Sequence, residues 1–380
     1  MQAHKTASVS APLRRLVHAA IAKNHGWLPF DRFMALALYA PGLGYYSRGS
    51  RQFGTLPGSG SDFVTAPELS PLFGQALARQ VAQALGASAS DAIWEFGAGS
   101  GALAEQLLDA LDELGAKVER YTIVDLSGAL RERQRERLRR FGARVQWVDA
   151  LPDAMQGVIV GNEVLDAMPV QLLHFDGARW FERGVAVVGD AVGDALQWAD
   201  RATDLRPPLA GPYSGLFAPG STVEIHPQAE AFVATLADRL TRGAAFFIDY
   251  GFPAAEYYHP QRTGGTLMCH RAHRADADPL VEVGEKDITA HVNFTGIAMA
   301  AQNAGLDVLG YTTQAHFLMN CGVMELLRGA DIKTTANTQK LLTEHEMGEL
   351  FKVIGLAKSC DAAFMQAPLG FTRGDRMHTL

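Results

Sequence analysis

The sequence contains little cysteine, and that scarcity excludes two classes of protein. Its three cysteines, Cys269, Cys321 and Cys360, lie far apart among 380 residues, and no C-x-x-C pair occurs. Disulfide frameworks use an even number of paired cysteines, and structural zinc sites use closely spaced ones. We therefore expect a reducing compartment, no structural zinc and no other metal site.

Excess positive charge and long apolar runs are also missing. The 34 basic and 41 acidic residues give a net charge of −7, so no general basic field attracts nucleic acid or anionic membranes. No apolar run approaches the length of a membrane span. Hydrophobic residues make up 48% and charged residues 20%, which is ordinary for a globular protein of one or two domains. We expect no nucleic acid partner and no membrane span.

Acidic residues are absent from the first thirty positions, which contain several basic ones. This composition fits a transit peptide loosely. However, an amphipathic helix pattern over residues 12–24 begins almost at once and leaves little to remove, and a second helix pattern over residues 28–38 follows. We therefore expect a cytoplasmic protein, with the mitochondrial matrix as the second choice.

Glycines at every second position follow a short apolar run that is typical of a buried strand. Gly97, Gly99 and Gly101 come after Glu95 and lead into a helix pattern over residues 102–114. Glycine allows a sharp turn and lets a ligand approach the main chain. The spacing is G-x-G-x-G rather than the dinucleotide fingerprint G-x-G-x-x-G. The segment resembles the nucleotide loop of class I S-adenosylmethionine (SAM) methyltransferases, although a plain strand–helix turn is an open alternative.

Carboxylates end the next two predicted strands. Residues 121–124 lead to Asp125, and residues 145–148 lead to Asp149. An acid at the first position can accept hydrogen bonds from both ribose hydroxyls of an adenosine ligand. An acid at the second could meet the adenine amino group. Strand, glycine turn, helix, strand and acid together predict an adenosine-type cofactor.

A polar cluster follows the fourth predicted strand, residues 157–161. It contains Asn162, Glu163 and Asp166, and Pro169 soon ends any helix. Ligands of open parallel sheets bind at the carboxyl ends of the strands. We expect Asn162 to contact the cofactor and the two carboxylates to take part in chemistry. The alternative is that one caps a turn and the other faces water.

Residues 62–68 precede a well-marked helix, which we place between Ser70 and Gly86. That helix leads into the strand before the glycine turn, so the loop in front of it should lie near the cofactor. The candidate cofactor contacts in this loop are Thr65, Pro67 and Glu68.

Three further segments favour structural interpretations. The tyrosines of residues 39–46 are expected to pack against their loop rather than contact a ligand, and the Gly/Ser-rich residues 48–60 are expected to be mobile. An arginine-rich helix over residues 130–141 suggests RNA binding. Glutamates interleave its arginines, so a solvated face with local ion pairs is the favoured interpretation.

Strand patterns alternate with helix patterns along most of the chain, which predicts an α/β fold with a mostly parallel sheet. Seven positions mark its strands: Ile93, Tyr121, Val145, Val158, Phe246, Leu306 and Phe351. Shorter strands are expected at residues 170–175, 180–188 and 221–225. We divide the chain into an N-terminal helical cap (residues 1–60) and a core (residues 61–380), with insertions near residues 176–220, 250–290 and 315–349.

Several motifs together are similar to one family. They are Gly-Tyr-Tyr at 44–46, Thr-Ala-Pro-Glu at 65–68, Pro-Leu-Phe-Gly at 71–74, Glu-Phe-Gly-Ala-Gly-Ser-Gly at 95–101, Asn-Glu at 162–163, Asp-Ala-Met-Pro-Val at 166–170, Asp-Tyr-Gly at 249–251 and Asp-Ile-Thr-Ala-His-Val at 287–292. From about residue 12 onward the chain resembles the MidA family of SAM-dependent methyltransferases, and we interpret it as a bacterial member.

The resemblance implies a class I methyltransferase fold, Rossmann-like, with a seven-stranded sheet whose last strand is antiparallel, and SAM as the cofactor. Mitochondrial members are assembly factors for respiratory complex I and are described as symmetric dimethylases of an arginine on a complex I subunit. The implied partner is therefore a protein substrate, possibly such a subunit, while the oligomeric state is left open. Asp125 stands where many members carry glutamate, and Ala98 where proline is common.

An arginine acceptor would set the chemistry of the site. Its guanidinium is effectively always protonated, so carboxylates must hold it and help a proton leave. On a helical turn, Glu163 and Asp166 would share a face and suit the planar group. Asp249 and Tyr250 are candidates for the substrate pocket. His291, at the start of a helix predicted over residues 287–305, is a candidate base, although a structural histidine is favoured.

Two other functions stay open. The chain could be a non-enzymatic assembly chaperone that uses SAM as a structural ligand. It could also be a nicotinamide-dependent dehydrogenase, although the glycine spacing and the acid before the glycines disfavour that function.

Overall fold

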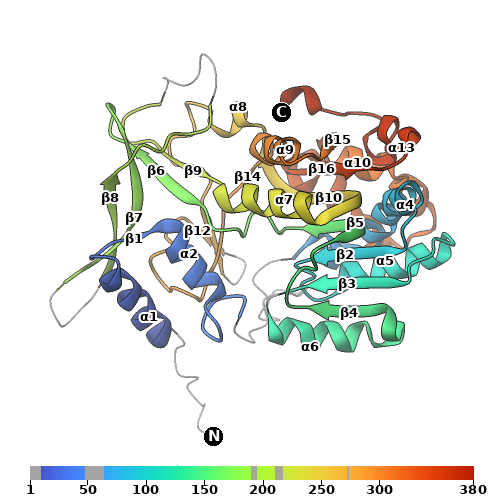
Figure 1. Cartoon of the computed structure of the whole chain (residues 1–380), viewed down its shortest axis with the longest axis horizontal. Coiled ribbons are helices and arrows are strands. Elements are labelled where there is room, and N and C mark those ends of the chain that lie inside the picture. The colour runs from blue at the N-terminus through green and yellow to red at the C-terminus, as the bar shows by residue number, and fades with distance from the viewer. Residues whose placement is uncertain (1–9, 48–63, 126, 190–194, 210–216, 272–273) are drawn as a thin grey trace, which may run out of the picture.

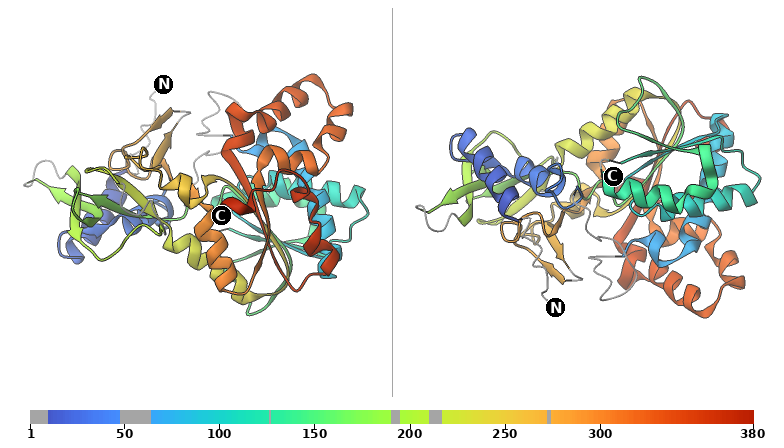
Figure 2. Two further views of the ribbon diagram at one scale, coloured as in Figure 1. Left: turned by 90° about the horizontal axis from the view of Figure 1, so that it is seen from above. Right: turned by 90° about the horizontal axis from the view of Figure 1, so that it is seen from below.

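The computed structural model describes residues 10–47, 64–125, 127–189, 195–209, 217–271 and 274–380. The segment predicted to be mobile, residues 48–60, and residues 62–63 of the following loop lie outside the described part of the chain. Figures 1 and 2 show a larger lobe built on one sheet and a smaller lobe that contains the N-terminal helices.

The larger lobe is built on a sheet whose strand order is β15-β16-β10-β5-β2-β3-β4. In chain order these strands are β2 (Ala92–Phe96), β3 (Arg120–Val124), β4 (Val145–Val148), β5 (Met155–Asn162), β10 (Leu240–Phe252), β15 (Asp307–Thr313) and β16 (Phe351–Lys358). All pairs from β10 to β4 are parallel, whereas β16 is antiparallel to both of its neighbours. The seven predicted strands and the antiparallel last strand are confirmed, and a short strand β14 (Val292–Asn293) also pairs with β10.

Helices cover both faces of this sheet, because alternate residues of a buried strand point to opposite sides. In β5, Val158 and Val160 pack in one core cluster with α4 (Pro71–Ser88) and α5 (Ala102–Glu113). Ile159 packs in the other cluster with α7 (Pro227–Arg239) and α9 (Phe294–Asn303). The helix α6 (Gly128–Arg137) connects β3 towards β4 (Figure 1). Because these strands are parallel, their carboxyl ends lie at the same edge of the sheet.

Local signals explain where α4 begins. The Ser70 side chain accepts a hydrogen bond from the Leu72 N–H at 3.2 Å, and Pro71 occupies the first helical position. The helix ends at Ser88 rather than at Gly86, where the sequence predicted its end, because Ala89 takes the left-handed conformation that closes it. The preceding short helix α3 (Ala66–Leu69) holds the loop that was expected to face the cofactor.

The segment before the last strand is mostly helical, as predicted. It contains α10 (Gln314–Asn320), α11 (Val323–Leu326), α12 (Ile332–Leu342) and a π-helical turn (Glu344–Gly348). After β16, α13 (Ala362–Gln366) packs against the same face of the core. Among the described residues, no helix is both long enough and apolar enough to span a bilayer.

The smaller lobe is a five-stranded antiparallel sheet that packs with two helices. Its elements are α1 (Ser10–Lys23), β1 (Leu28–Pro29), α2 (Phe30–Tyr39), β6 (Gln171–Phe175), β7 (Trp180–Val188), β8 (Ala195–Ala202) and β9 (Thr222–Ile225). The helices predicted as an N-terminal cap thus share a hydrophobic core with strands from residues 171–202. The three short strands predicted here are confirmed, while the domain boundaries stay a prediction.

Two of these strands differ from the expectation. Strand β1 lies where a helix was predicted to start, because residue 28 pairs with Val185 far along the chain. Gly184 permits this pairing, since a Cβ there would lie 2.3 Å from the Leu28 carbonyl oxygen. Strand β8 was not predicted, and it pairs along β7 with mostly exposed residues.

A three-stranded sheet is inserted between β10 and α9 of the larger lobe, and it shares the hydrophobic core of the smaller lobe. It consists of β11 (Met268–Arg271), β12 (Arg274–Asp276) and β13 (Asp287–Thr289), and a short helix α8 (Ala254–Tyr257) precedes it. The prediction that a helix begins at residue 287 is therefore wrong. Residues 287–289 pair with β11 instead, and the helix begins at Phe294 after the cap residue Asn293.

Candidate active site

A cavity of about 940 Å³ lies at the carboxyl ends of β2, β3, β4 and β5 and extends to the smaller lobe and to β11–β13. Ligands of open parallel sheets bind at this edge, and the volume suits a cofactor-sized ligand. Twelve predicted site residues line it: Thr65, Pro67, Glu95, Gly97, Gly99, Asp125, Asp149, Asn162, Glu163, Asp166, Tyr250 and His291. Three predicted site residues, Glu68, Gly101 and Asp249, are not among its lining residues.

The glycine turn forms one wall of the cavity. Gly97, Gly99 and Gly101 have φ angles of 63°, 54° and 82°, a region that residues with a Cβ rarely adopt. Gly101 serves as the N-cap of α5 rather than as a wall residue, and its N–H donates to the Ala98 carbonyl at 2.7 Å. The alternation of glycines therefore builds the turn, and two of the three also give space to a ligand.

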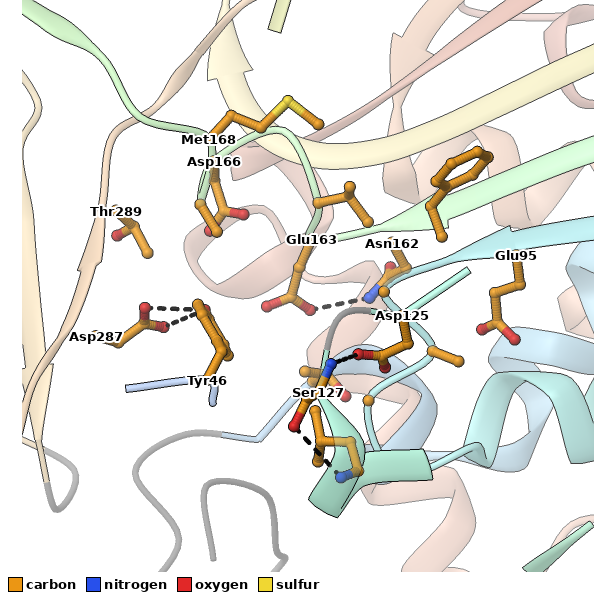
Figure 3. A pocket seen from close by; sticks show the side chains of 18 of the residues that line it. Tyr46, Glu95, Asp125, Ser127, Asn162, Glu163, Asp166, Met168, Asp287 and Thr289 are labelled. Atoms are coloured by element: carbon orange, nitrogen blue, oxygen red, sulfur yellow. Dashed lines mark hydrogen bonds between the residues drawn. The ribbon is translucent and has the colours of Figure 1, made fainter. Parts of the chain in front are cut away.

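Asp125 follows β3 and is held by hydrogen bonds from both directions. It accepts one from the Ser127 N–H at 2.8 Å (Figure 3) and one from Gln134 Nε2 at 2.7 Å. The same Gln134 nitrogen donates to the Gly99 carbonyl at 2.9 Å, so this side chain fixes the acid relative to the glycine turn. Burial raises the pKa of Asp125. Gln134, which lies on the arginine-rich helix α6, was not predicted as a site residue.

Asp149 lies at the rim of the cavity. Its side chain is 89% exposed and pairs with Arg131 at 2.6 Å. Arg131 in turn donates to the main-chain carbonyls of Asp125 at 2.6 Å and Val148 at 2.9 Å. One arginine of the predicted solvated face is therefore largely buried and connects the ends of β3 and β4.

The loop before α4 contributes Thr65 and Pro67 to the cavity but not Glu68. The Glu68 carboxylate instead binds the Ser100 hydroxyl and pairs with Arg137 at 3.2 Å. Glu68, which was predicted to contact the cofactor, thus contacts the glycine turn through Ser100.

Glu95 lies at the end of β2 and is only 2% exposed. Its carboxylate accepts a hydrogen bond from the Tyr121 hydroxyl at 2.9 Å. Burial raises the pKa of Glu95 to about 8, although the tyrosine opposes the shift. At neutral pH the group therefore lines the cavity mainly in its protonated form.

A second group of polar side chains surrounds the opposite end of the cavity (Figure 3). Glu163 accepts a hydrogen bond from Asn162 Nδ2 at 3.1 Å, and its φ of 55° is unusual for a residue with a Cβ. Burial, followed by the charge of Asp166, raises the pKa of Glu163 to about 8. Burial raises the pKa of Asp166 to about 6, against the effect of a hydrogen bond from the Tyr250 hydroxyl.

The sequence suggested that Glu163 and Asp166 share a helical face, and the structure shows that they do not. They lie on a turn after β5, which Asp249 holds from outside the cavity. Asp249 Oδ2 accepts hydrogen bonds from the N–H groups of Val164, Leu165 and Asp166 at 3.1, 2.9 and 3.2 Å. Asp249 therefore anchors the turn, and it is not among the residues that line the cavity.

His291 lines the cavity from the extended segment after β13, and not from a helix start. Its ring stacks on Phe252, with centroids 5.2 Å apart, and meets the Tyr250 ring edge-on at 5.0 Å. Burial, followed by the charge of Arg262, lowers the pKa of His291 to about 4. A packed, neutral imidazole agrees with the structural interpretation that was favoured.

Several lining residues were not predicted to be part of the site, and three of them are polar residues joined to the acidic turn or to β13: Tyr39, Tyr46 and Asp287. The Tyr46 hydroxyl hydrogen-bonds both carboxylate oxygens of Asp287, at 2.8 and 2.9 Å. The Tyr39 hydroxyl donates to the Ala167 carbonyl at 2.8 Å. The Gly-Tyr-Tyr and Asp-Ile-Thr-Ala-His-Val motifs were the signals available, but the tyrosines were interpreted as packing residues.

The cavity is lined by acidic rather than basic side chains. Among the described residues that line it, none is lysine or arginine, while six are acidic: Glu95, Asp125, Asp149, Glu163, Asp166 and Asp287. Three lining oxygens, Asn162 Oδ1, Asp166 Oδ1 and Thr289 Oγ1, are buried without a hydrogen-bond partner in the described chain. Such atoms indicate a polar ligand. These residues fit SAM, which carries a sulfonium and an ammonium group.

The glycine turn, Asp125, Asp149 and Asn162 would hold SAM at the strand ends. Left-handed glycines leave the main chain open to close approach, and the Asp125 carboxylate can accept from ribose hydroxyls. Glu163 and Asp166 line the same cavity from the turn after β5.

Comparisons with known proteins agree with this fit. A protein from Burkholderia thailandensis crystallised with S-adenosylhomocysteine is 50% identical, with a TM-score of 0.91 over 100% of this chain and 99% of that one. Two relatives are named protein arginine methyltransferase NDUFAF7, mitochondrial, or its homolog. The human protein is 26% identical and the alignment covers 92% of this chain and 83% of the relative. The Caenorhabditis elegans protein is 27% identical over 80% and 75%.

A family described as "Putative S-adenosyl-L-methionine-dependent methyltransferase" matches residues 76–312. The matched segment contains the glycine turn, the two strand-end acids and the Glu163 turn, and it spans more than half of the chain. The chain therefore belongs to this family of SAM-dependent methyltransferases.

Proposed function

We propose that the protein transfers methyl groups from SAM to arginine side chains of a protein substrate. The observation that carries the proposal is the arrangement of acids at one end of the cavity, formed by the turn after β5. We call this end the acceptor end. There Glu163 and Asp166 lie on one anchored turn, in a cavity whose described lining contains no lysine or arginine. A planar, permanently charged guanidinium is the acceptor that paired carboxylates bind best.

The two carboxylates suit the proton balance of this reaction. SAM, when bound, supplies a methyl group on a positively charged sulfur. An arginine nitrogen would form the new N–C bond as the S–CH3 bond breaks and S-adenosylhomocysteine is released, and one proton of that nitrogen must then leave. Glu163, with a pKa raised to about 8, would give up its own proton when the guanidinium binds, because a nearby cation stabilises the carboxylate. The resulting carboxylate can take the proton that the methylated arginine releases.

Relatives support the choice of acceptor without deciding it. The mitochondrial proteins that align with most of this chain are named protein arginine methyltransferases, at 26–27% identity. By the resemblance to the MidA family, we extend the proposal to symmetric dimethylation and to a subunit of respiratory complex I as the substrate. A cytoplasmic location stays a prediction.

Methyl labelling tests the proposal directly. The purified protein is incubated with methyl-labelled SAM and a lysate of cells that lack it, and labelled proteins are digested and analysed by mass spectrometry. We expect label on arginine, with S-adenosylhomocysteine as an inhibiting control. Label on another residue type would overturn the arginine assignment. Tight SAM binding without any labelled protein would favour the alternative of a SAM-binding assembly chaperone.

A further inference from the structure

Asp287 is a buried carboxylate of the acceptor end to which the proposed chemistry gives no role. It begins β13, is 3% exposed and lines the cavity, and in Figure 3 it lies on the other side of Glu163 from Asp125. Figure 3 shows its carboxylate facing the same space as those of Glu163 and Asp166. Its charge also contributes to raising the pKa of Glu163, so the two groups interact across the cavity.

Tyr46 holds this carboxylate in place. Its hydroxyl lies 2.8 and 2.9 Å from the two Asp287 oxygens, and its ring stacks on Tyr39 with centroids 5.6 Å apart. Tyr39 in turn hydrogen-bonds the carbonyl of Ala167, next to Asp166. One chain of contacts therefore fixes Asp287 relative to the turn that carries the other two acids.

The site also contains a buried carboxylate oxygen without a hydrogen-bond donor in the described part of the chain. Asp166 is 5% exposed, lines the cavity, and its Oδ1 atom has no hydrogen-bond partner among the described residues. A buried carboxylate oxygen without a donor is costly, and a ligand with several N–H groups would satisfy it. The five N–H groups of a guanidinium can reach carboxylates on more than one side.

We propose that Asp287 is a third acceptor-binding carboxylate, positioned by Tyr46, that selects a cationic guanidinium over a neutral side chain of the same shape. The proposal rests on the arginine methyltransferase function proposed above. Glu163 and Asp166 would bind the guanidinium from the turn after β5, and Asp287 would bind it from β13. Tyr46 is a positioning residue, because it acts through Asp287.

The test compares two small probes, N-acetyl-arginine-N-methylamide and its neutral isostere N-acetyl-citrulline-N-methylamide. Each is titrated by NMR into the protein saturated with S-adenosylhomocysteine. We expect the wild type to prefer the arginine probe. Asp287→Asn should weaken arginine-probe binding by about tenfold or more and leave citrulline-probe binding nearly unchanged, because only the charged contact is lost.

Tyr46→Phe keeps the stacked ring and removes only the hydroxyl. It should weaken arginine-probe binding by about threefold to tenfold, and the double variant should bind no worse than Asp287→Asn alone, because the two residues act as one unit. Asp204→Asn makes the same chemical change at an exposed position outside the cavity and should behave as the wild type. S-adenosylhomocysteine affinity reports the integrity of every variant.

The outcomes separate this inference from the function on which it rests. If Glu163→Gln weakens arginine-probe binding while Asp287→Asn does not, the role of Asp287 is wrong and the arginine function stands. Equal loss of both probes in Asp287→Asn would also overturn the inference, since it would indicate a structural role. A wild type that does not distinguish the two probes would overturn the inference and the arginine function together.

Discussion

Glu163 has a backbone conformation that residues with a Cβ avoid. Its φ of 55° costs on the order of 1–3 kcal/mol, and such residues persist where the surrounding structure determines them. Here the Glu163 N–H donates to the Ile248 carbonyl at 2.9 Å, and Asp249 holds the next three N–H groups. The end of β10 therefore imposes the turn that aims Glu163 into the cavity.

Glu95 gives a pH dependence of stability that can be measured. Its pKa in the folded protein is about 8, above its ordinary value of 4.5, so the folded state binds this proton more tightly than the unfolded state. The stability that Glu95 contributes is fully present below pH 4.5 and is lost as the pH rises through about 8. Glu95→Gln, which can still accept from Tyr121, should melt at least about 3 °C above the wild type at pH 9.

The comparison needs two further measurements. At pH 5 the melting temperatures of Glu95→Gln and the wild type should be similar, because both side chains are then neutral. Glu136→Gln, on the exposed face of α6, should follow the wild type at every pH. Parallel curves for Glu95→Gln and the wild type between pH 5 and 9 would contradict the assigned protonation of Glu95.

At the scale of the elements, the glycine turn between β2 and α5 makes the clearest prediction. Gly99 lines the cavity with a φ of 54°, where a β-branched side chain is a steric outlier. Gly99→Val should therefore weaken SAM affinity at least tenfold, measured by calorimetry, by distorting the turn and filling cofactor space. Gly86→Val is the matched control, because a Cβ there meets open space on the surface of α4. Unchanged affinity in Gly99→Val would exclude close contact between cofactor and turn.

Strands whose signals are local could be predicted from the sequence. The seven strands of the main sheet are short apolar runs bounded by turns and separated by helix patterns, and all seven were found. Strands β1 and β13 could not be found in this way, because their conformation depends on partners far along the chain. Leu28 pairs with Val185, and Ile288 pairs with Cys269.

Side-chain roles could likewise be predicted where they depend on local sequence, and could not where they depend on distant partners. The position of Asp125 at a strand end was enough to predict a place in the cavity. The equally placed Asp249 turned out to bind main-chain N–H groups, because the turn after the neighbouring strand β5 presents them to it. Asp287 and Tyr46 meet only through the packing of the N-terminal helices against the inserted strands, for which the sequence gives no local signal.

At the scale of the whole molecule, the proposed function assigns the cofactor and the acceptor to two ends of one cavity. The parallel strand ends supply the glycine turn and Asp125, while the turn after β5 and the small sheet supply Glu163, Asp166 and Asp287 (Figure 3). Because the acceptor end is separate from the cofactor end, variants at the two ends should have opposite defects. Asp125→Ala should weaken SAM affinity as its main effect, by loss of the ribose contact.

The rate of methyl incorporation by Glu163→Gln at saturating SAM tests the central claim most directly. Gln keeps the shape of the side chain and removes the charge that holds the guanidinium. Losing one partner of a buried charge pair costs about 2–5 kcal/mol, so incorporation into lysate proteins should fall well over tenfold. SAM affinity should stay within about twofold of the wild type. Incorporation at the wild-type rate under these conditions would show that Glu163 is structural and would contradict the proposed arginine chemistry.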